Sequence, residues 1–250
     1  MLFGVSGGIE KMNKIMMPLF FVFFLILLFR VASLPGAVEG YKYLFIPRWE
    51  LLGNVKTWVY ALGQAFFSLS LAGSGTIVYG SYLSDDADVV TCARNVAFFD
   101  TCAALLAGMV VIPAVFAFGL DVTAGPPLMF ITLPAVFNQM PAGWLFAVIF
   151  FIAVLFAAIT SLMNLFETPI EALQEQFQMS RKAAVAWVAL IAAAVGVFIE
   201  SADAVSMWMD AVSIYMIPLG ALLAAVMFFW VCPKGFAREQ VQKGREKMLG

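Results

Sequence analysis

Six long apolar runs dominate this 250-residue chain and decide the solvent in which it can fold. A helix that crosses the hydrocarbon core of a bilayer needs about 20 predominantly apolar residues. The runs that reach or approach this length are residues 15–34, 58–83, 96–120, 144–170 or a little beyond, 183–199 and 205–232. Because the runs are continuous and do not alternate with polar residues, they exclude a transmembrane β-barrel. The sequence therefore predicts an all-α polytopic membrane protein with about six transmembrane helices.

The composition supports this class and removes several others. The chain is 63% hydrophobic and 12% charged, as expected of an integral membrane protein, and we expect no nucleic-acid partner. It contains no histidine, and Cys92, Cys102 and Cys232 have no short spacing. This pattern excludes a usual zinc site and argues against a disulfide framework.

The basic residues are distributed unevenly over the two faces that six spans would create. Of the 14 Lys and Arg residues, only Arg30, Lys42, Arg48 and Lys56 fall on one face. The other ten share the face that carries both termini, so the positive-inside rule places the termini in the cytoplasm. We expect the protein in the inner membrane. The basic tail is expected to be solvated or to meet anionic lipid headgroups.

The second apolar run is interrupted in its middle. Residues 68–74 read Ser-Leu-Ser-Leu-Ala-Gly-Ser, which places poor helix formers with hydroxyl groups at the depth where a membrane is driest. Unpaired backbone groups are costly there, so such a break persists only where it lines a cavity. In transporters, interruptions of this kind mark the site for ions and substrate. A small-residue packing face between helices is the alternative interpretation.

Polar side chains also lie inside the third and fourth runs. Asp100 should face a partner or an aqueous cavity, because an acid at mid-helix depth costs roughly 2.5–3.5 kcal/mol, unless it lies near enough to the interface to stay hydrated. Thr160 and Ser161 offer oxygens of the hard type that Na⁺ prefers, although such hydroxyls often bond carbonyls of their own helix. Glu167 follows Thr160 by two turns on nearly the same face, as a buried structural pair or a gate residue.

Two connections between the runs carry distinctive residues. The acidic loop 84–88 is expected to cap the helix that follows it. The external loop 121–143 is apolar and contains several prolines, so we expect it to be tucked against the protein. It is either an extracellular lid or a packed connection.

Four motifs resemble one family of transporters. They are GQAFFSLSLAGSGTIVYGSYL at 63–83, MFITLPAVFNQMP at 129–141, LFAAITSLMNLFETPIEALQ at 155–174 and MSRKAA at 179–184. In this order and spacing they resemble the neurotransmitter:sodium symporter family, in its bacterial amino-acid-transporting branch. The resemblance implies a fold in which inverted repeats and broken helices surround the substrate site.

The resemblance extends along the whole chain but covers only the fifth to tenth helices of that family. It implies a single transmembrane domain, apparently a fragment, with a scaffold helix and external loop in 1–56. The five-helix second repeat occupies 57–232 with the lid loop 121–143, and a basic cytoplasmic tail occupies 233–250. We therefore expect an incomplete portion of a transporter, either truncated or completed by a separate chain that supplies the missing helices.

The resemblance also implies residues of the first site. In the interrupted run, Phe67 would shield the substrate, Ser70 would contact the amino acid, and Ser68 would coordinate the first Na⁺ beside the substrate. Gln64 would support this ion site. Gly73 stands where the family has a bulky residue, which implies a roomier pocket.

Residues of the third and fourth runs complete the implied sites. Asp100 matches an Asn or Asp ligand of the first Na⁺. Ala157, Thr160 and Ser161 match a second Na⁺ site, and Ser161 and Leu165 match positions of the substrate pocket. The family resemblance offers no reason for an enzyme.

The mechanism implied is sodium-coupled symport of amino acids by alternating access, with Na⁺ organising the broken helices. A non-transporting membrane remnant or accessory subunit is the alternative, because half of the liganding residues would be absent. An intramembrane aspartyl hydrolase is a distant third, because Asp100 and Asp210 would have to meet in one site.

We predict that transport does not require chloride. Chloride-dependent members of the family that the chain resembles place a neutral serine one turn after the position of Asp100, where this chain has Ala104. An ionised Asp100 supplies the negative charge itself. Uptake by the complete transporter should persist when gluconate replaces chloride, and a large loss of uptake would refute the prediction.

Overall fold

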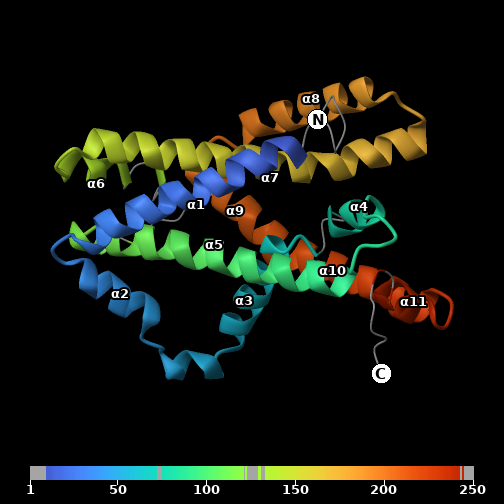
Figure 1. The fold of residues 1–250 in the computed structure, drawn as a ribbon, viewed down its shortest axis with the longest axis horizontal. Coiled ribbons are helices and arrows are strands. Elements are labelled where there is room, and N and C mark those ends of the chain that lie inside the picture. Colours follow the sequence, from blue (N-terminus) through green and yellow to red (C-terminus); the bar gives the residue numbers. More distant parts are fainter. Residues whose placement is uncertain are drawn as a thin grey trace. The chain divides into compact units, whose positions relative to one another are not determined.

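A computed structural model describes residues 10–71, 75–120, 122, 129–130, 133–242 and 244 of the protein, and all regular structure in these ranges is helical (Figure 1). This confirms the all-α prediction. Within the same ranges, five helical stretches are long and apolar enough to cross a membrane: Glu10–Ala32, Val89–Ala117, Gly143–Phe177, Arg181–Phe198 and Asp203–Val231. They correspond to five of the six predicted spans.

The helices form two compact units. The first unit comprises Met1–Trp49 and Ala103–Met207, and the second comprises Glu50–Cys102 and Trp208–Gly250. The boundaries of these units differ in kind from the predicted division into scaffold helix, second repeat and tail, and that division stays a prediction.

The first unit is built on the packing of α1 (Glu10–Ala32) against α7 (Gly143–Phe177). Phe24 and Leu27 of α1 are three residues apart, so they share one face of the helix, and both are buried. The ring of Phe24 lies 6.0 Å from the ring of the buried Phe150 of α7. An aromatic contact between the two long helices is therefore part of the apolar core of this unit.

The start of α1 differs from the prediction. The described helix already includes Glu10, five residues before the predicted span 15–34, and Pro18 lies inside it. An ion pair of 2.6 Å between Lys14 and Glu10, four residues apart, lets the polar residues continue the helix outside the apolar run.

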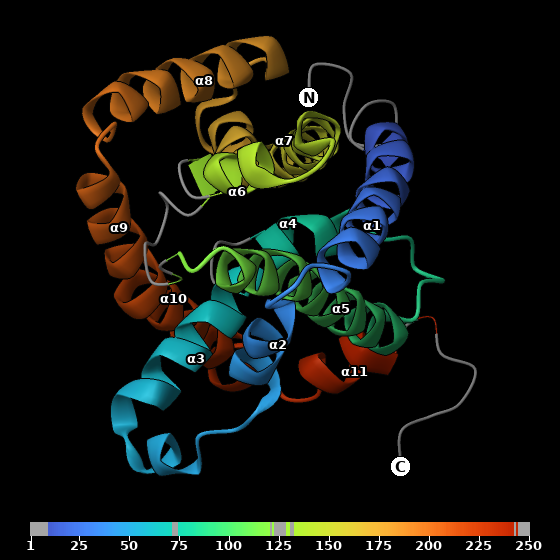
Figure 2. The ribbon, with the colours of Figure 1, turned by 90° about the vertical axis from the view of Figure 1, so that its left-hand side faces the viewer.

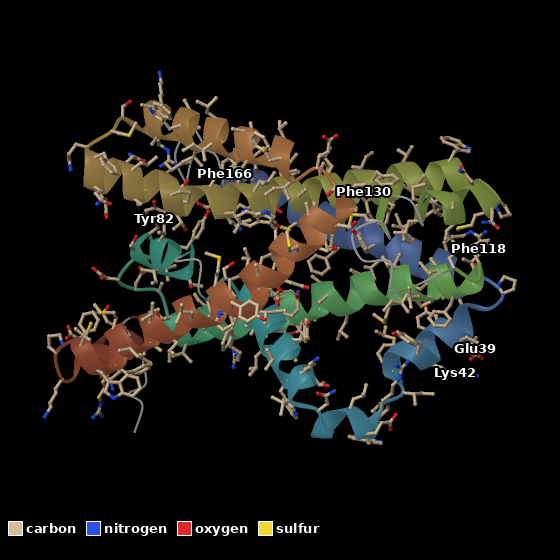
Figure 3. The ribbon with its side chains drawn as sticks, turned by 180° about the vertical axis from the view of Figure 1, so that it is seen from behind. Glu39, Lys42, Tyr82, Phe118, Phe130 and Phe166 are labelled. Atoms are coloured by element: carbon tan, nitrogen blue, oxygen red, sulfur yellow. The ribbon has the colours of Figure 1, made fainter. Side chains whose placement is uncertain are left out.

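The predicted external loop after α1 contains two helices, α2 (Ala37–Phe45) and the short η2 (Trp49–Gly53). Gly40 of α2 lies against α5 (Val89–Ala117), and a Cβ atom at Gly40 would lie only 2.4 Å from the Cα of Pro113. On the outer face of α2, Lys42 and Glu39 form an ion pair of 2.7 Å at the edge of the unit (Figure 3). The loop prediction was wrong here because α2 is stabilised by tertiary packing.

The proline-rich connection contains α6 (Leu133–Gln139), which packs along α7 (Figure 2). Leu133, Val136 and Phe137 of α6 are buried. The prediction that this apolar stretch is tucked against the protein is confirmed for α6. Residues 121, 123–128 and 131–132 lie outside the described ranges, so the choice between a lid and a packed connection stays open.

The second unit contains α3 (Val55–Ser68), α4 (Gly75–Ser81), the start of α5 and most of the last span. The last span consists of α9 (Ala202–Asp210), the π-helical η4 (Ala211–Met216), α10 (Ile217–Val226) and the π-helical η5 (Met227–Val231), and α11 (Phe236–Gln242) follows it.

The acidic loop before α5 caps that helix, as predicted. One carboxylate oxygen of Asp88 accepts hydrogen bonds from the N–H groups of Val90 (3.0 Å) and Thr91 (3.2 Å), and the other accepts from the Thr91 hydroxyl (2.7 Å). In the same loop, a hydrogen bond from the Ser84 side chain lowers the pKa of Asp86. Both effects keep negative charge at the positive end of the α5 dipole.

A buried ion pair joins α7 to α8 (Arg181–Phe198) in the first unit. One guanidinium nitrogen of Arg181 donates to both carboxylate oxygens of Glu167, each at 2.8 Å. The Glu167 side chain is fully buried and that of Arg181 is 22% exposed. Ile170 and Ala184 are buried in the same helix pair. Of the two interpretations of Glu167, the contacts show a structural pair.

We predict that Arg181→Met destabilises the protein strongly. The substitution removes the guanidinium from a fully buried carboxylate, and breaking a buried pair in this way costs about 3 kcal/mol or more. Thermal unfolding in detergent should show a clearly lower Tm. The double variant Glu167→Met/Arg181→Met should recover most of the loss because no charge is then left without its partner.

The exposed pair on α1 supplies the control. Glu10→Gln should change Tm little, because its pair is 53% and 72% exposed on its two sides and such pairs contribute about 1 kcal/mol or less. A loss in Arg181→Met no larger than the loss in Glu10→Gln would contradict a stabilising role for the buried pair.

Candidate sodium and substrate site

The second predicted span is two helices separated by a break. α3 ends at Ser68 and α4 begins at Gly75, and Leu69–Leu71 are not helical. Residues 72–74, which include Gly73, lie outside the described part of the chain. The predicted interruption of this span is therefore confirmed, while the proposed role of Gly73 in the pocket stays a prediction.

The end of α3 is closed by a pair of main-chain hydrogen bonds. The N–H of Leu71 donates to the carbonyl of Phe66, and the N–H of Ser70 donates to the carbonyl of Phe67, both at 3.1 Å. These are the two bonds of a Schellman motif, which satisfies carbonyl groups at a helix end. The chain thus leaves the helix in an ordered way.

Ser70 occupies the left-handed position of this motif, with a φ angle of 54°. Glycine usually takes this position, and a residue with a Cβ atom pays on the order of 1 kcal/mol for it. The sequence offered no signal for this conformation. A strained residue in a break inside a span is a feature that clusters at functional sites.

The Ser68 side chain meets the carboxylate of Asp100. Its hydroxyl donates to one oxygen of Asp100 at 2.6 Å, although the two residues are 32 positions apart in the sequence. Because α5 begins at Val89 and not near residue 96 as predicted, Asp100 lies three turns inside the helix. It has the polar partner that an acid at that position was expected to need.

This contact places several oxygen atoms at one point of the second unit. The carboxylate of Asp100 and the hydroxyl of Ser68 lie at the C-terminal end of α3, where the helix dipole contributes partial negative charge. Hard cations are held by carboxylate, hydroxyl and main-chain carbonyl oxygens. The arrangement can therefore bind a small cation. Metal-binding clusters of three or more His, Cys, Asp or Glu residues do not occur among the described residues.

Two other residues expected at the site, Gln64 and Phe67, lie on α3 shortly before Ser68. Gln64 lies one turn before Ser68, so it shares the same face of α3. Phe67, the residue expected to shield the substrate, is 40% exposed within the described chain. The aromatic side chain that precedes Ser68 is thus partly exposed, and its role in shielding the substrate stays a prediction.

The residues expected at a second Na⁺ site lie together on α7, in the first unit. The Thr160 side chain is 2% exposed, and its hydroxyl donates to the carbonyl of Ala157 at 2.9 Å. This bond to the helix's own carbonyl also brings two of the expected oxygen ligands side by side. Ser161 and Leu165 are one turn apart on an exposed face of α7. Their roles in ion and substrate binding stay predictions.

Thr76 of α4 was not singled out from the sequence. Its hydroxyl donates to the carbonyl of Ser70 at 2.9 Å, across residues 72–74. A hydroxyl near the start of the second half-helix was the available signal, but sequence spacing alone does not reveal which carbonyl it reaches.

The chain matches the model of the sodium:neurotransmitter symporter family over residues 1–250. It is 40% identical over 179 residues to the uncharacterized sodium-dependent transporter YhdH of Bacillus subtilis. The aligned region covers 72% of this chain and 40% of YhdH. It is 32% identical over 261 residues to an uncharacterized sodium-dependent transporter of Methanocaldococcus jannaschii, with coverage of 99% and 53%.

A solved transporter structure is also similar to this chain. The crystal structure of MhsT in complex with L-phenylalanine matches with a TM-score of 0.88 and 33% identity, over 98% of this chain and 58% of MhsT. The chain spans about half the length of these relatives. Sequence and structure agree that the chain belongs to the sodium:neurotransmitter symporter family, whose members are sodium-dependent membrane transporters and not enzymes.

Proposed function

We propose that this chain forms part of a sodium-coupled amino-acid symporter that works by alternating access. The observation that carries the proposal is the contact of Ser68 with Asp100 at the broken end of α3. It joins a helix interruption, a carboxylate and a hydroxyl, which are the components of a transporter ion site. Sodium is the expected ion because the relatives are named sodium-dependent transporters.

The amino-acid class of the substrate rests on two features. MhsT, which shares the fold, was solved in complex with L-phenylalanine. In this chain, Ser70 and Phe67 flank Ser68 at the end of α3, where an amino-acid carboxylate would reach the bound Na⁺ and its side chain would meet an aromatic ring. From the family resemblance, we propose that Ser161, Leu165 and Gly73 also contact the substrate.

A second Na⁺ is proposed for α7. The buried Thr160 hydroxyl donates to the Ala157 carbonyl, and Ser161 follows directly in the sequence. These neutral oxygens would hold Na⁺ without a carboxylate. Each positive charge that moves through the membrane gains about 2.3 kcal/mol per 100 mV, so two ions would drive uphill uptake of an amino acid.

Transport is proposed to require helices beyond those matched here, because the relatives that carry the family's fold are about twice as long. They would belong either to a longer form of this chain or to a separate chain. We further propose an inner-membrane location with both termini in the cytoplasm, on the basis of the basic residues counted above. A non-transporting accessory subunit is the alternative, and it is favoured only by the partial coverage of the relatives.

We predict Na⁺-dependent binding of amino acids to the purified protein. Labelled L-phenylalanine, followed by other labelled L-amino acids, would be tested with and without a co-expressed segment that corresponds to the relatives' N-terminal half. Binding should appear in Na⁺, vanish in choline and require the co-expressed segment. Absence of any Na⁺-dependent binding in both preparations would favour the accessory role.

Two aspartate variants test the residue that carries the proposal. Asp100→Ala removes the carboxylate that meets Ser68, so it should raise the Na⁺ concentration needed for half-maximal binding at least about tenfold, as expected for a lost charged ligand. Asp210→Ala removes a carboxylate at the end of α9 and should leave the Na⁺ dependence unchanged. Equal effects of the two substitutions would contradict the assignment of Asp100.

A further inference from the structure

The Thr76 hydroxyl bond differs from two other hydroxyl-to-carbonyl bonds of the second unit. Thr101 of α5 donates to the carbonyl of Ala97 at 2.8 Å, and Ser81 of α4 donates to the carbonyl of Val78 at 2.7 Å. Both are ordinary bonds within one turn of the same helix. Thr76 instead reaches back six residues, out of α4, to the carbonyl of Ser70 beyond the end of α3.

The bond complements the cap of α3. The Schellman bonds fix the N–H groups of Ser70 and Leu71, and the Thr76 hydroxyl takes up the carbonyl between them. The peptide group that joins Ser70 to Leu71 is therefore held at both its N–H and its C=O. In a membrane interior this also satisfies a carbonyl that no helix pairs.

The bond from Thr76 helps to hold the strained conformation of Ser70. A serine with a φ angle of 54° persists only where its surroundings hold it. Ser70 lies two residues after Ser68, whose hydroxyl meets Asp100. A relaxed Ser70 would change the direction in which the chain leaves α3 and would disturb Ser68 at the last position of the helix.

We propose that Thr76 is a positioning residue for the first sodium site: its hydroxyl ties α4 to Ser70 and so holds the end of α3, with Ser68, against Asp100. This inference rests on the proposed function, because it assigns the bond a purpose in ion binding. Thr76 acts through Ser70 and touches neither the ion nor the substrate.

The test compares three substitutions in the protein co-expressed with the N-terminal segment. Thr76→Val keeps the shape of the side chain and removes the hydroxyl, Thr76→Ser keeps the hydroxyl, and Thr101→Val removes an ordinary hydroxyl bond of α5. The readout is the Na⁺ concentration for half-maximal thermal stabilisation, at constant ionic strength with choline. The Tm without Na⁺ is recorded separately and reports any general loss of stability.

Thr76→Val should raise this Na⁺ concentration about fivefold, the effect expected from one lost hydrogen bond. Thr76→Ser and Thr101→Val should both remain close to the wild type. Wild-type Na⁺ dependence in Thr76→Val would overturn the inference and leave the symporter proposal intact. A wild-type protein without Na⁺ stabilisation would instead overturn the proposed function and the inference with it.

A second test covers the case in which Thr76→Val is too unstable to purify. Glycine adopts the left-handed conformation without strain. In the Ser70→Gly background, the Thr76 hydroxyl is therefore less needed to stabilise the backbone conformation at position 70. The Ser70→Gly/Thr76→Val double variant should therefore fold and show a Na⁺ dependence close to that of Ser70→Gly alone. A further fivefold loss in the double variant would overturn the inference, because the two residues would then act independently.

Discussion

A polypeptide that leaves its helix inside a bilayer has to pair its peptide groups without water, and the second unit of this protein is arranged around that requirement. The N–H groups at the end of α3 bond back to Phe66 and Phe67, and the Ser70 carbonyl is taken up by the Thr76 hydroxyl. Because these groups are paired, Leu69–Leu71 form an ordered end to α3. The ordered end of α3 in turn brings Ser68 to Asp100.

The surroundings of α3 contribute a second constraint, which is close backbone contact. A Cβ atom on Gly63 would lie 2.6 Å from the carbonyl oxygen of Ser213, so α3 approaches η4 at a distance that only glycine permits. Small residues allow this kind of approach between helices in membranes. Gly63 lies five residues before Ser68, so the contact fixes α3 against the last span near the end of α3 that carries Ser68. Small-residue packing therefore occurs at Gly63 of α3, and the packing interpretation of residues 68–74 stays a prediction.

Much of this could be predicted from the sequence, because the strongest signals are local or depend on composition. Apolar runs located the long helices, clustered hydroxyl residues located the break, and the acidic loop predicted the Asp88 cap. One feature set by a tertiary contact was missed: α2 forms where Gly40 packs against Pro113. The helical turn at Glu10 was also missed, because it lies in a polar segment before the apolar run, where the local pair of Lys14 with Glu10 supports the helix. The Ser70 conformation was also missed, since glycine usually takes this position and a serine gives no indication of it.

The measurement closest to the central claim is equilibrium binding of radioactive sodium to the protein with its co-expressed N-terminal segment. The contact between Ser68 and Asp100 predicts saturable binding that unlabelled Na⁺ displaces and equal K⁺ does not. The double variant Ser68→Ala/Asp100→Ala should lose one class of sites, and the sites attributed to Thr160 should remain. Saturable binding with unchanged affinity and unchanged number of sites in that double variant would contradict the claim that the broken end of α3 holds sodium.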